Sequence, residues 1–154
     1  MEYKNEIIQK SIKQFAKVIN EYLKYDSVPR DYGTNELLYN SEIHMIQAIG
    51  YKMGETVTEL SQSISITKGG VSQTVSKLEK KGYIIKERKA KYGKEIILML
   101  SEKGKKAFNV HEKSHSKFSS SMAEYMKTLS DEKLSGIEEM LNFIGDHFEK
   151  IKNK

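Results

Sequence analysis

The hydrophobic residues of this chain follow a helical spacing along most of its length. Large apolar side chains recur every three or four positions, as on one face of an amphipathic helix, in six segments, which are 7–23, 43–50, 57–63, 68–81, 101–122 and 134–151. The period then changes in two runs rich in β-branched residues, 83–88 and 95–100, which predict a β-hairpin with a basic tip at 89–94. The pattern therefore predicts a mainly α protein with one small hairpin.

Residues typical of helix ends separate these segments. Asn40-Ser41, Thr56 and Thr67 can each cap a following helix, and Gly82 can end the helix that Thr67 begins. Two short helices joined by a tight turn and followed by a hairpin make a winged helix-turn-helix. We therefore expect an α+β fold, mainly α with a small β-hairpin wing. The expected domains are a winged helix-turn-helix DNA-binding domain at 37–105 and a helical dimerisation region at 1–36 and 106–154.

The charge of the chain is concentrated in its middle. The 154 residues carry a net charge of +5, but Thr67 to Lys106 holds twelve Lys or Arg and four Glu, a net +8, which leaves −3 for the rest. A basic segment on a neutral scaffold fits a phosphate-binding surface, although charge alone fits a solvated face equally well. The arrangement of helices and hairpin decides in favour of DNA.

Composition excludes several classes of protein. The absence of Cys excludes disulfides, thiolate metal ligands, cysteine nucleophiles and thiol redox sensors. No apolar run approaches the roughly 20 residues that a membrane span requires. The first residues lack the continuous apolar region of a secretory signal, so we expect a cytoplasmic protein that does not act at a membrane.

The second helix of the helix-turn-helix is expected to enter the major groove. Its first turn contains Gly69 and Gly70, whose missing side chains let backbone N–H groups approach phosphates. Gln73 can pair with adenine. The predicted DNA-binding residues are Thr67, Lys68, Gly69, Gly70, Ser72, Gln73 and Lys77 on the helix and Arg88, Lys89, Lys91 and Lys94 on the hairpin.

Five motifs resemble those of the MarR family of bacterial transcription regulators. They are Glu42-Ile43-His44-Met45-Ile46 after Leu38-Tyr39, Thr56 to Ser61, Ile66 to Gln73, Leu78 to Ile84, and Leu100 to Lys105. The resemblance implies a homodimeric repressor whose terminal helices interlock and whose two winged lobes read a pseudo-palindromic operator in double-stranded DNA. The family's wing carries an Asp-rich tip followed by Arg, which 89–94 lacks, so Arg88 or Lys91 would take the place of that arginine.

The resemblance also assigns a role to two apolar stripes. A homodimer would bury one face of the first predicted helix and one face of the last, on which apolar residues alternate at steps of three and four. The predicted dimer-interface residues are Ile8, Ile12, Phe15, Ile19, Leu134, Ile137, Leu141, Ile144 and Phe148.

Three histidines are spaced as metal ligands. His111 and His115 are four residues apart on one predicted helix face, a common way to hold one metal ion. In the zinc-sensing branch of the MarR family, which the chain resembles here, three histidine ligands fall at His44, His111 and His115, and an acidic ligand falls near Asp26. Three imidazoles and a carboxylate suit Zn²⁺. The alternative is three ordinary surface or interface histidines.

Other interpretations of the site stay open at the level of sequence. The string from His111 to His115 also matches the HExxH pattern of zinc hydrolases, but the chain offers no evident third ligand for such an enzyme, so we expect a non-enzyme. A second type of MarR regulator would respond to a small anionic or aromatic ligand in the cleft between dimer core and lobe. In the zinc-sensing branch metal usually promotes DNA binding, which favours zinc as a corepressor.

Overall fold

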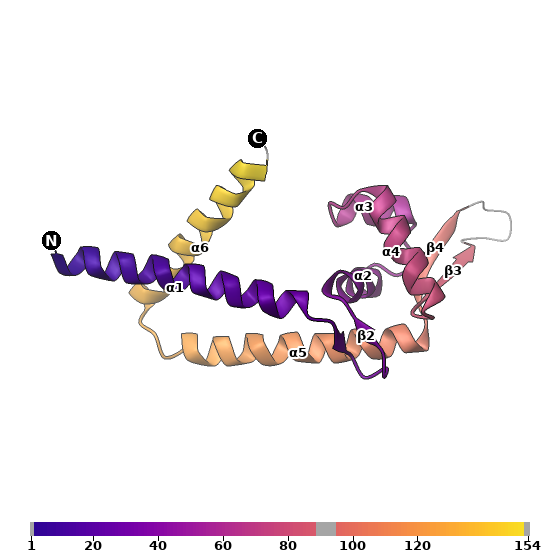
Figure 1. Cartoon of the computed structure of the whole chain (residues 1–154), viewed down its shortest axis with the longest axis horizontal. Helices are drawn as coiled ribbons and strands as arrows, with labels where there is room; N and C mark the ends of the chain where they lie inside the picture. The colour runs from indigo at the N-terminus through magenta and orange to yellow at the C-terminus, as the bar shows by residue number, and fades with distance from the viewer. Residues whose placement is uncertain (1, 89–94, 153–154) are drawn as a thin grey trace. The chain divides into compact units, whose positions relative to one another are not determined.

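The computed structural model describes residues 2–88 and 95–152 and is mostly helical (Figure 1). Its elements in chain order are α1 (Glu2–Ser27), β1 (Arg30–Asp31), β2 (Leu37–Leu38), α2 (Asn40–Tyr51), α3 (Val57–Ser63), α4 (Lys68–Lys80), β3 (Ile84–Arg88), β4 (Ile96–Leu100), α5 (Glu102–Met126) and α6 (Asp131–Lys152). Among the described residues, no helix is both long enough and apolar enough to cross a membrane.

The predicted helices and the wing are confirmed, and the fold is that of a winged helix-turn-helix protein. Strands β3 and β4 pair antiparallel with Ile84 opposite Leu100 and Arg88 opposite Ile96. Thr67 caps α4, because its hydroxyl accepts the N–H of Gly70 at 3.2 Å. Gly82 has a φ of +77°, a left-handed conformation that ends the helix and turns the chain into the wing.

The start of α2 differs from the prediction. Asn40-Ser41 is not the cap, because α2 begins at Asn40 itself and the capping residue is Tyr39. The side chain of Glu42 accepts the Tyr39 N–H at 2.9 Å, as the glutamate of a capping box does. The Asn40 amide is used elsewhere, since it donates to the Asp26 carboxylate.

A second small hairpin joins α1 to α2, where the sequence indicated only the end of a helix. Arg30 pairs with Leu38 and Asp31 with Leu37. The turn is held by the Asp31 carboxylate, which accepts the backbone N–H groups of Thr34 and Asn35 at 2.8 and 3.1 Å. This hairpin brings Leu38 into the core, where it is fully buried.

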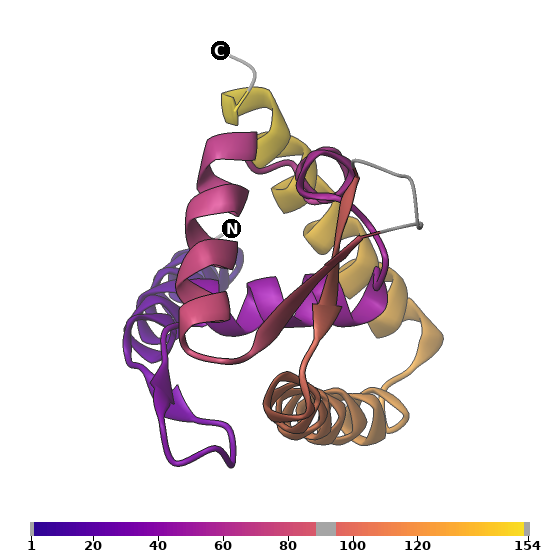
Figure 2. The same cartoon turned by 90° about the vertical axis from the view of Figure 1, so that its right-hand side faces the viewer.

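The hydrophobic core lies in the winged lobe. It is built by α2, α3, α4, the wing and the first turns of α5, and Figure 2 shows α4 beside the wing strands with α2 crossing behind them. Val71, Val75 and Leu78 are fully buried, so the stripe predicted for α4 is confirmed. The buried apolar residues are Tyr32, Leu38, Ile43, Met45, Ile46, Ile49, Leu60, Val71, Val75, Leu78, Tyr83, Ile84, Leu98, Leu100 and Ala107.

The chain divides into two compact units, one up to Glu112 and one from Lys113 on, and the division falls within the continuous helix α5. In the first unit α1 has no buried residue, and Ile8, Ile12 and Phe15 on its apolar face are exposed. In the second unit Leu141 and Phe148 of α6 are exposed in the same way. These are residues that the sequence predicted for a dimer interface.

Candidate functional site

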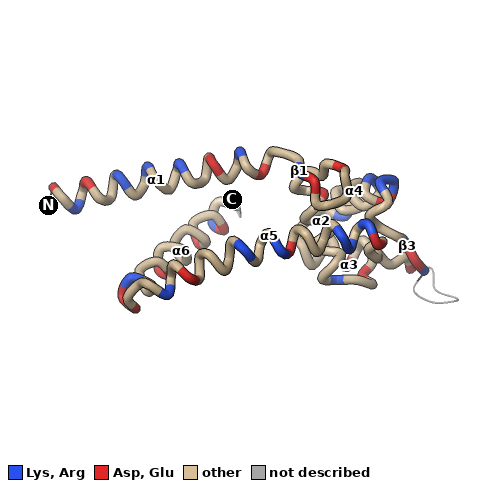
Figure 3. The backbone as a smooth tube through the Cα atoms, turned by 90° about the horizontal axis from the view of Figure 1, so that it is seen from below, with Lys and Arg blue, Asp and Glu red and all other residues tan. Residues whose placement is uncertain are grey.

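The polar face of α4 is open to solvent. Lys68, Gly69, Ser72, Gln73 and Lys77 are exposed, while the opposite face of the helix is packed into the core. Lysines gather at the C-terminal end of α4, whereas charges of both signs occur along α1 (Figure 3). A helix that presents Gln, Ser and Lys on one solvent face has the side chains that contact base edges and phosphates.

The two glycines of α4 have different surroundings. A Cβ added at Gly69 would meet nothing within 4 Å, so its backbone is open to a close approach from outside. A Cβ at Gly70 would lie 3.2 Å from both the Ile66 side chain and the Thr67 hydroxyl, which also accepts the Gly70 N–H. Gly70 therefore fits the tight turn between α3 and α4, and Gly69 is the glycine whose N–H could face a phosphate.

The predicted wing residues are only partly described. Arg88 is the last residue of β3 and is exposed, as a DNA-contacting side chain requires. Lys89, Lys91 and Lys94 lie outside the described residues.

A buried carboxylate joins α2 to the C-terminal end of α4. Glu42 is only 2% exposed, and its Oε1 lies 3.1 Å from the Lys77 ammonium and 2.9 Å from that of Lys81. Burial raises the pKa of Glu42, but the hydrogen bonds from Lys81, the Tyr39 N–H and Lys77 outweigh it and hold the pKa below its ordinary value of 4.5. Lys77, which the sequence predicts as a DNA contact, is thus held by Glu42 in the DNA-free chain.

A second ion pair network ties the β1–β2 hairpin to the same end of α4. Glu36 lies 2.7 Å from the Lys103 ammonium and 3.7 Å from that of Lys81, and it accepts the Tyr83 hydroxyl at 3.4 Å. The hydrogen bond from Lys103 holds the pKa of Glu36 below its ordinary value. Lys103 also donates to the Lys81 carbonyl at 2.8 Å, so the last turn of α4 is bound from two sides.

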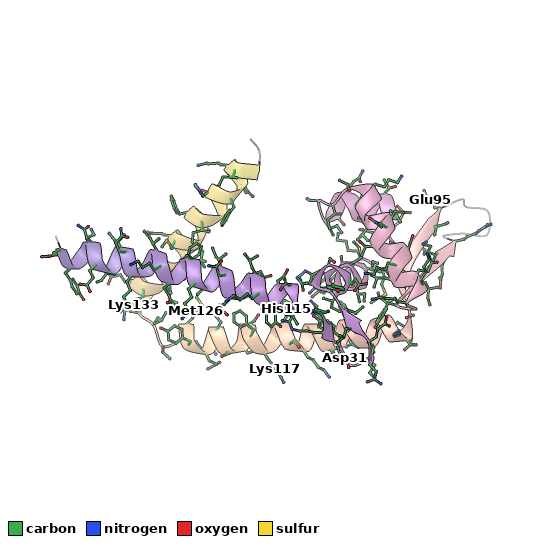
Figure 4. The ribbon with its side chains drawn as sticks, in the orientation of Figure 1. Asp31, Glu95, His115, Lys117, Met126 and Lys133 are labelled. Carbon is green, nitrogen blue, oxygen red and sulfur yellow. The ribbon has the colours of Figure 1, made fainter. Side chains whose placement is uncertain are left out.

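The three predicted histidines come together. One ligand atom from each of His44, His111 and His115 lies within 4.8 Å of the others. His44 is on α2 and His111 on α5, and their ring centroids are 5.4 Å apart. His111 is buried against Tyr32, whose ring meets it edge-on at 5.5 Å. His115 is exposed one turn further along α5 (Figure 4).

Asp26 stands next to this histidine cluster without being part of it. Among the described residues, the group of three or more possible metal ligands within 4.8 Å of one another consists of the three histidines and does not include Asp26. The Asp26 carboxylate accepts the amide of Asn40, and the same amide nitrogen is 3.4 Å from Nδ1 of His44. Asn40 therefore connects the end of α1 to the cluster.

The glutamate of the HExxH string points to α2. Oε1 of Glu112 accepts the Gln47 amide at 2.7 Å, and its other oxygen accepts the Tyr51 hydroxyl. The hydrogen bond to Glu112 raises the pKa of Tyr51. In a zinc hydrolase this glutamate is a general base acting on a metal-bound water, whereas here both of its oxygens hold side chains of a neighbouring helix.

A groove of about 610 Å³ runs between α2 and the start of α4. Met45, Ala48, Ile64 and Ile66 form its apolar walls. The other lining residues are Ser41, His44, Gln47, Tyr51, Lys52, Gly70 and Thr74. An apolar groove with a few polar groups at its edge has the composition of a small-molecule site.

Sequence reasoning missed the residues that connect these sites. Glu42 stands in a motif that resembles the MarR family, but the sequence does not show its capping and ion-pairing role, because Tyr39 replaces the Ser or Thr that usually marks a capping box, and burial of a charge cannot be read from spacing. The sequence predicts Asn40 as a cap, and Gln47 and Tyr51 lie on a part of α2 where the pattern indicates only apolar packing.

The comparisons with known proteins agree with this fold. Residues 47–118 match a family model described as a winged helix DNA-binding domain. The chain is 27% identical over 144 residues to the HTH-type transcriptional regulator SarZ of Staphylococcus epidermidis, an alignment that covers 94% of this chain and 88% of the relative. Residues 47–118 therefore form a winged helix DNA-binding domain, and the chain as a whole is similar to transcriptional regulators.

Two solved structures share the fold across nearly the whole chain. FabT of Streptococcus pneumoniae, solved in complex with DNA, has a TM-score of 0.70 and 22% identity, covering 94% of this chain and 99% of that one. ZitR of Lactococcus lactis, described as a zinc-responsive MarR family member, has a TM-score of 0.73 and 19% identity, covering 92% and 99%. In fold, the chain is similar to the MarR-type structures.

Proposed function

We propose that this chain is a MarR-type transcriptional regulator, acting as a homodimeric repressor, whose affinity for operator DNA is controlled by Zn²⁺. The observation that carries the proposal is the gathering of His44, His111 and His115. The cluster uses the helix α2 that also ion-pairs with α4 through Glu42. A proposed zinc ligand, His44, and the residue that holds α4, Glu42, thus lie on the same helix, α2.

The DNA-binding part of the proposal rests on the exposed face of α4. Ser72, Gln73 and Lys77 would read base edges or phosphates in the major groove, and Gly69 would let the backbone approach a phosphate. Arg88, with Lys89, Lys91 and Lys94, would contact the backbone or the minor groove beside it. The homodimer would place two such lobes on the half-sites of one operator.

The histidines fit zinc by the chemistry of their donors. Neutral imidazole nitrogen is a preferred Zn²⁺ ligand, and a structural zinc site takes four ligands. Asp26 is the candidate for the fourth, because Asn40 already links its carboxylate to His44. Bound zinc would supply a cross-link, holding α2 against α5.

The proposed control acts through the rigidity of α2. His44 and Glu42 are two residues apart on this helix, and Glu42 holds Lys77 of α4 and Lys81, which caps the C-terminal end of α4. An α2 fixed to α5 would hold α4 in the position that suits the operator, so zinc and DNA would each raise the affinity of the other. Zinc is then a corepressor.

The test is to measure operator affinity and metal content together. Protein purified without added zinc is analysed for metal, and its operator affinity is measured in EDTA and in Zn²⁺. We expect tighter DNA binding with zinc, and the loss of this response in His111→Ala. His147→Ala, which removes a histidine outside the cluster, is the matched control. Equal operator affinity in EDTA and Zn²⁺, or normal zinc affinity in His111→Ala, contradicts zinc control.

A second candidate effector is a small anionic or aromatic molecule. The groove between α2 and α4 favours it, since Lys52 and His44 are polar lining residues among apolar walls. Protein that contains no zinc after purification but releases DNA when an aromatic carboxylate is added would support this candidate over the metal. Salt dependence of DNA binding is expected in either case, because phosphate contacts release counterions.

A further inference from the structure

Glu112 makes a polar contact between α5 and α2 beside His111 of the histidine cluster. It follows His111 directly on α5, and it holds Gln47 and Tyr51, which lie three and seven residues after His44 on α2. The carboxylate has hydrogen bonds to two consecutive turns of the neighbouring helix. Such a two-point contact restrains both the rotation of α5 and its position along α2.

Aromatic packing extends this contact between α5 and α2. The Tyr51 ring meets the Phe108 ring edge-on, with centroids 5.4 Å apart. Phe108 also packs closely on α2, since a Cβ added at Gly50 would lie 2.5 Å from its ring. Phe108 and Glu112 are one turn apart on α5, so ring and carboxylate hold Tyr51 from two sides.

We propose that Glu112 is a positioning residue that sets zinc affinity by holding His111 of α5 in register with His44 of α2. This rests on the proposed function. The two histidines belong to different helices, so their separation depends on how those helices are fixed to each other. Glu112 fixes α5 to α2 within one helical turn of the His111 and His44 imidazoles, before any metal binds. The glutamate of the HExxH string thus acts on protein side chains and takes no part in hydrolysis.

The contact between α5 and α2 predicts which variants change the affinity for zinc. In Glu112→Gln, the amide nitrogen cannot accept a hydrogen bond and the negative charge is removed, so one of the two charged hydrogen bonds, from Gln47 or from Tyr51, is lost and the other is weakened. In Tyr51→Phe, only the hydroxyl is lost, from a side chain that is 63% exposed, so the fold itself should be little affected. Glu124→Gln, which removes an exposed carboxylate of the same helix paired with Lys127, is the matched control.

The experiment measures Zn²⁺ affinity by competition with a chromophoric chelator, using the full-length chain. We expect Glu112→Gln to weaken zinc binding by about 10-fold, the low end for residues that support metal ligands. Tyr51→Phe should weaken it by a smaller factor, and the effects of the two substitutions should be less than additive in the double variant, because both weaken the contact made by the same carboxylate. Glu124→Gln should bind zinc as the wild type does.

Unfolding of the metal-free protein separates positioning from general stability. For Tyr51→Phe, we expect an unchanged denaturation midpoint in EDTA together with the weaker zinc binding. Unchanged zinc affinity in both variants overturns the proposal, as does a loss of affinity that appears only where the metal-free fold is also weakened. If wild-type protein binds zinc and His111→Ala does not, while the Glu112 variants are normal, the positioning role alone fails. A wild type that binds no zinc overturns the proposed zinc control as well.

Discussion

At the scale of single residues, Glu42 connects the start of α2 to the C-terminal end of α4. A buried carboxylate is costly to desolvate and is stable only when its partners compensate for the lost water. Glu42 has three such partners, which are the Tyr39 N–H and the ammonium groups of Lys77 and Lys81. Because Lys77 is 54% exposed, it can leave Glu42 for a phosphate while Lys81 keeps the carboxylate paired.

Glu42→Gln tests this role through its pH dependence. The pKa of Glu42 is lower in the folded chain than its ordinary value of 4.5, so the folded state favours the charged form. Its stabilising contribution is therefore fully present above pH 4.5 and is lost as the pH falls through the folded pKa. We expect the variant to lose about 2 kcal/mol of unfolding free energy at pH 7, and less at pH 3.5.

Urea unfolding at the two pH values measures the difference. Glu124→Gln removes an exposed carboxylate, 73% accessible and paired only with Lys127 across one helical turn, and should change stability little at either pH. A Glu42→Gln effect of the same size at pH 7 and pH 3.5 would contradict the linkage to this carboxyl group.

At the scale of elements, the periodicity of apolar residues predicts the helices that bury one face in the core. The α4 stripe of Val71, Val75 and Leu78 could be identified because burial on one face imposes the helical period. The β1–β2 hairpin could not, since two strands of two residues carry no period and depend on the Asp31 turn. The histidine cluster was predicted by resemblance and by spacing along α5, but the approach of α2 is a tertiary contact that no local pattern encodes.

The first turns of α5 pack so closely on the wing that a single methyl group is excluded. A Cβ at Gly104 would lie 2.1 Å from the Tyr83 carbonyl oxygen, which also accepts the Ser101 N–H at 3.0 Å and is therefore fixed. We expect Gly104→Ala to lower the unfolding free energy by about 3 kcal/mol, although alanine favours helix. Chemical denaturation measures this. Gly104→Ala with wild-type stability would show that the contact between α5 and the wing is looser than described.

Substitution of Gly69 on α4 by alanine should raise the unfolding free energy, opposite to the effect at Gly104. Nothing lies within 4 Å of a Cβ at this position, so Gly69→Ala should stabilise the fold by up to about 1 kcal/mol through helix propensity. The same methyl group would separate the backbone from a phosphate, and we expect weaker binding to operator DNA. Denaturation and a DNA titration on the same sample test both effects. A variant that is more stable and binds DNA normally would place the phosphate contact elsewhere.

At the scale of the whole molecule, the excess of basic charge and the long exposed apolar helix faces belong to different segments of the chain. The basic excess lies in the segment of α4, the wing and the start of α5, whereas α1 and α6 carry exposed apolar residues among charges of both signs. The free-energy cost of an apolar face exposed to water grows with its area, and a second copy of the chain can bury such a face. A homodimer would also double the number of DNA contacts, which raises affinity without any new type of contact.

Leu141→Asp on α6 tests the homodimer. Leu141 is 62% exposed in the single chain, so a monomer should accept aspartate, whereas an apolar interface should not. We expect a dimer in the wild type and a monomer in the variant by sedimentation, with the winged lobe still folded. Operator affinity should fall by at least about 100-fold, because the two half-sites are then bound independently. Leu37→Asp, at a similarly exposed position in β2, is the control and should remain dimeric. A dimeric Leu141→Asp, or a monomeric wild type that binds its operator tightly, would show that α6 does not supply the interface and that its apolar face has another partner.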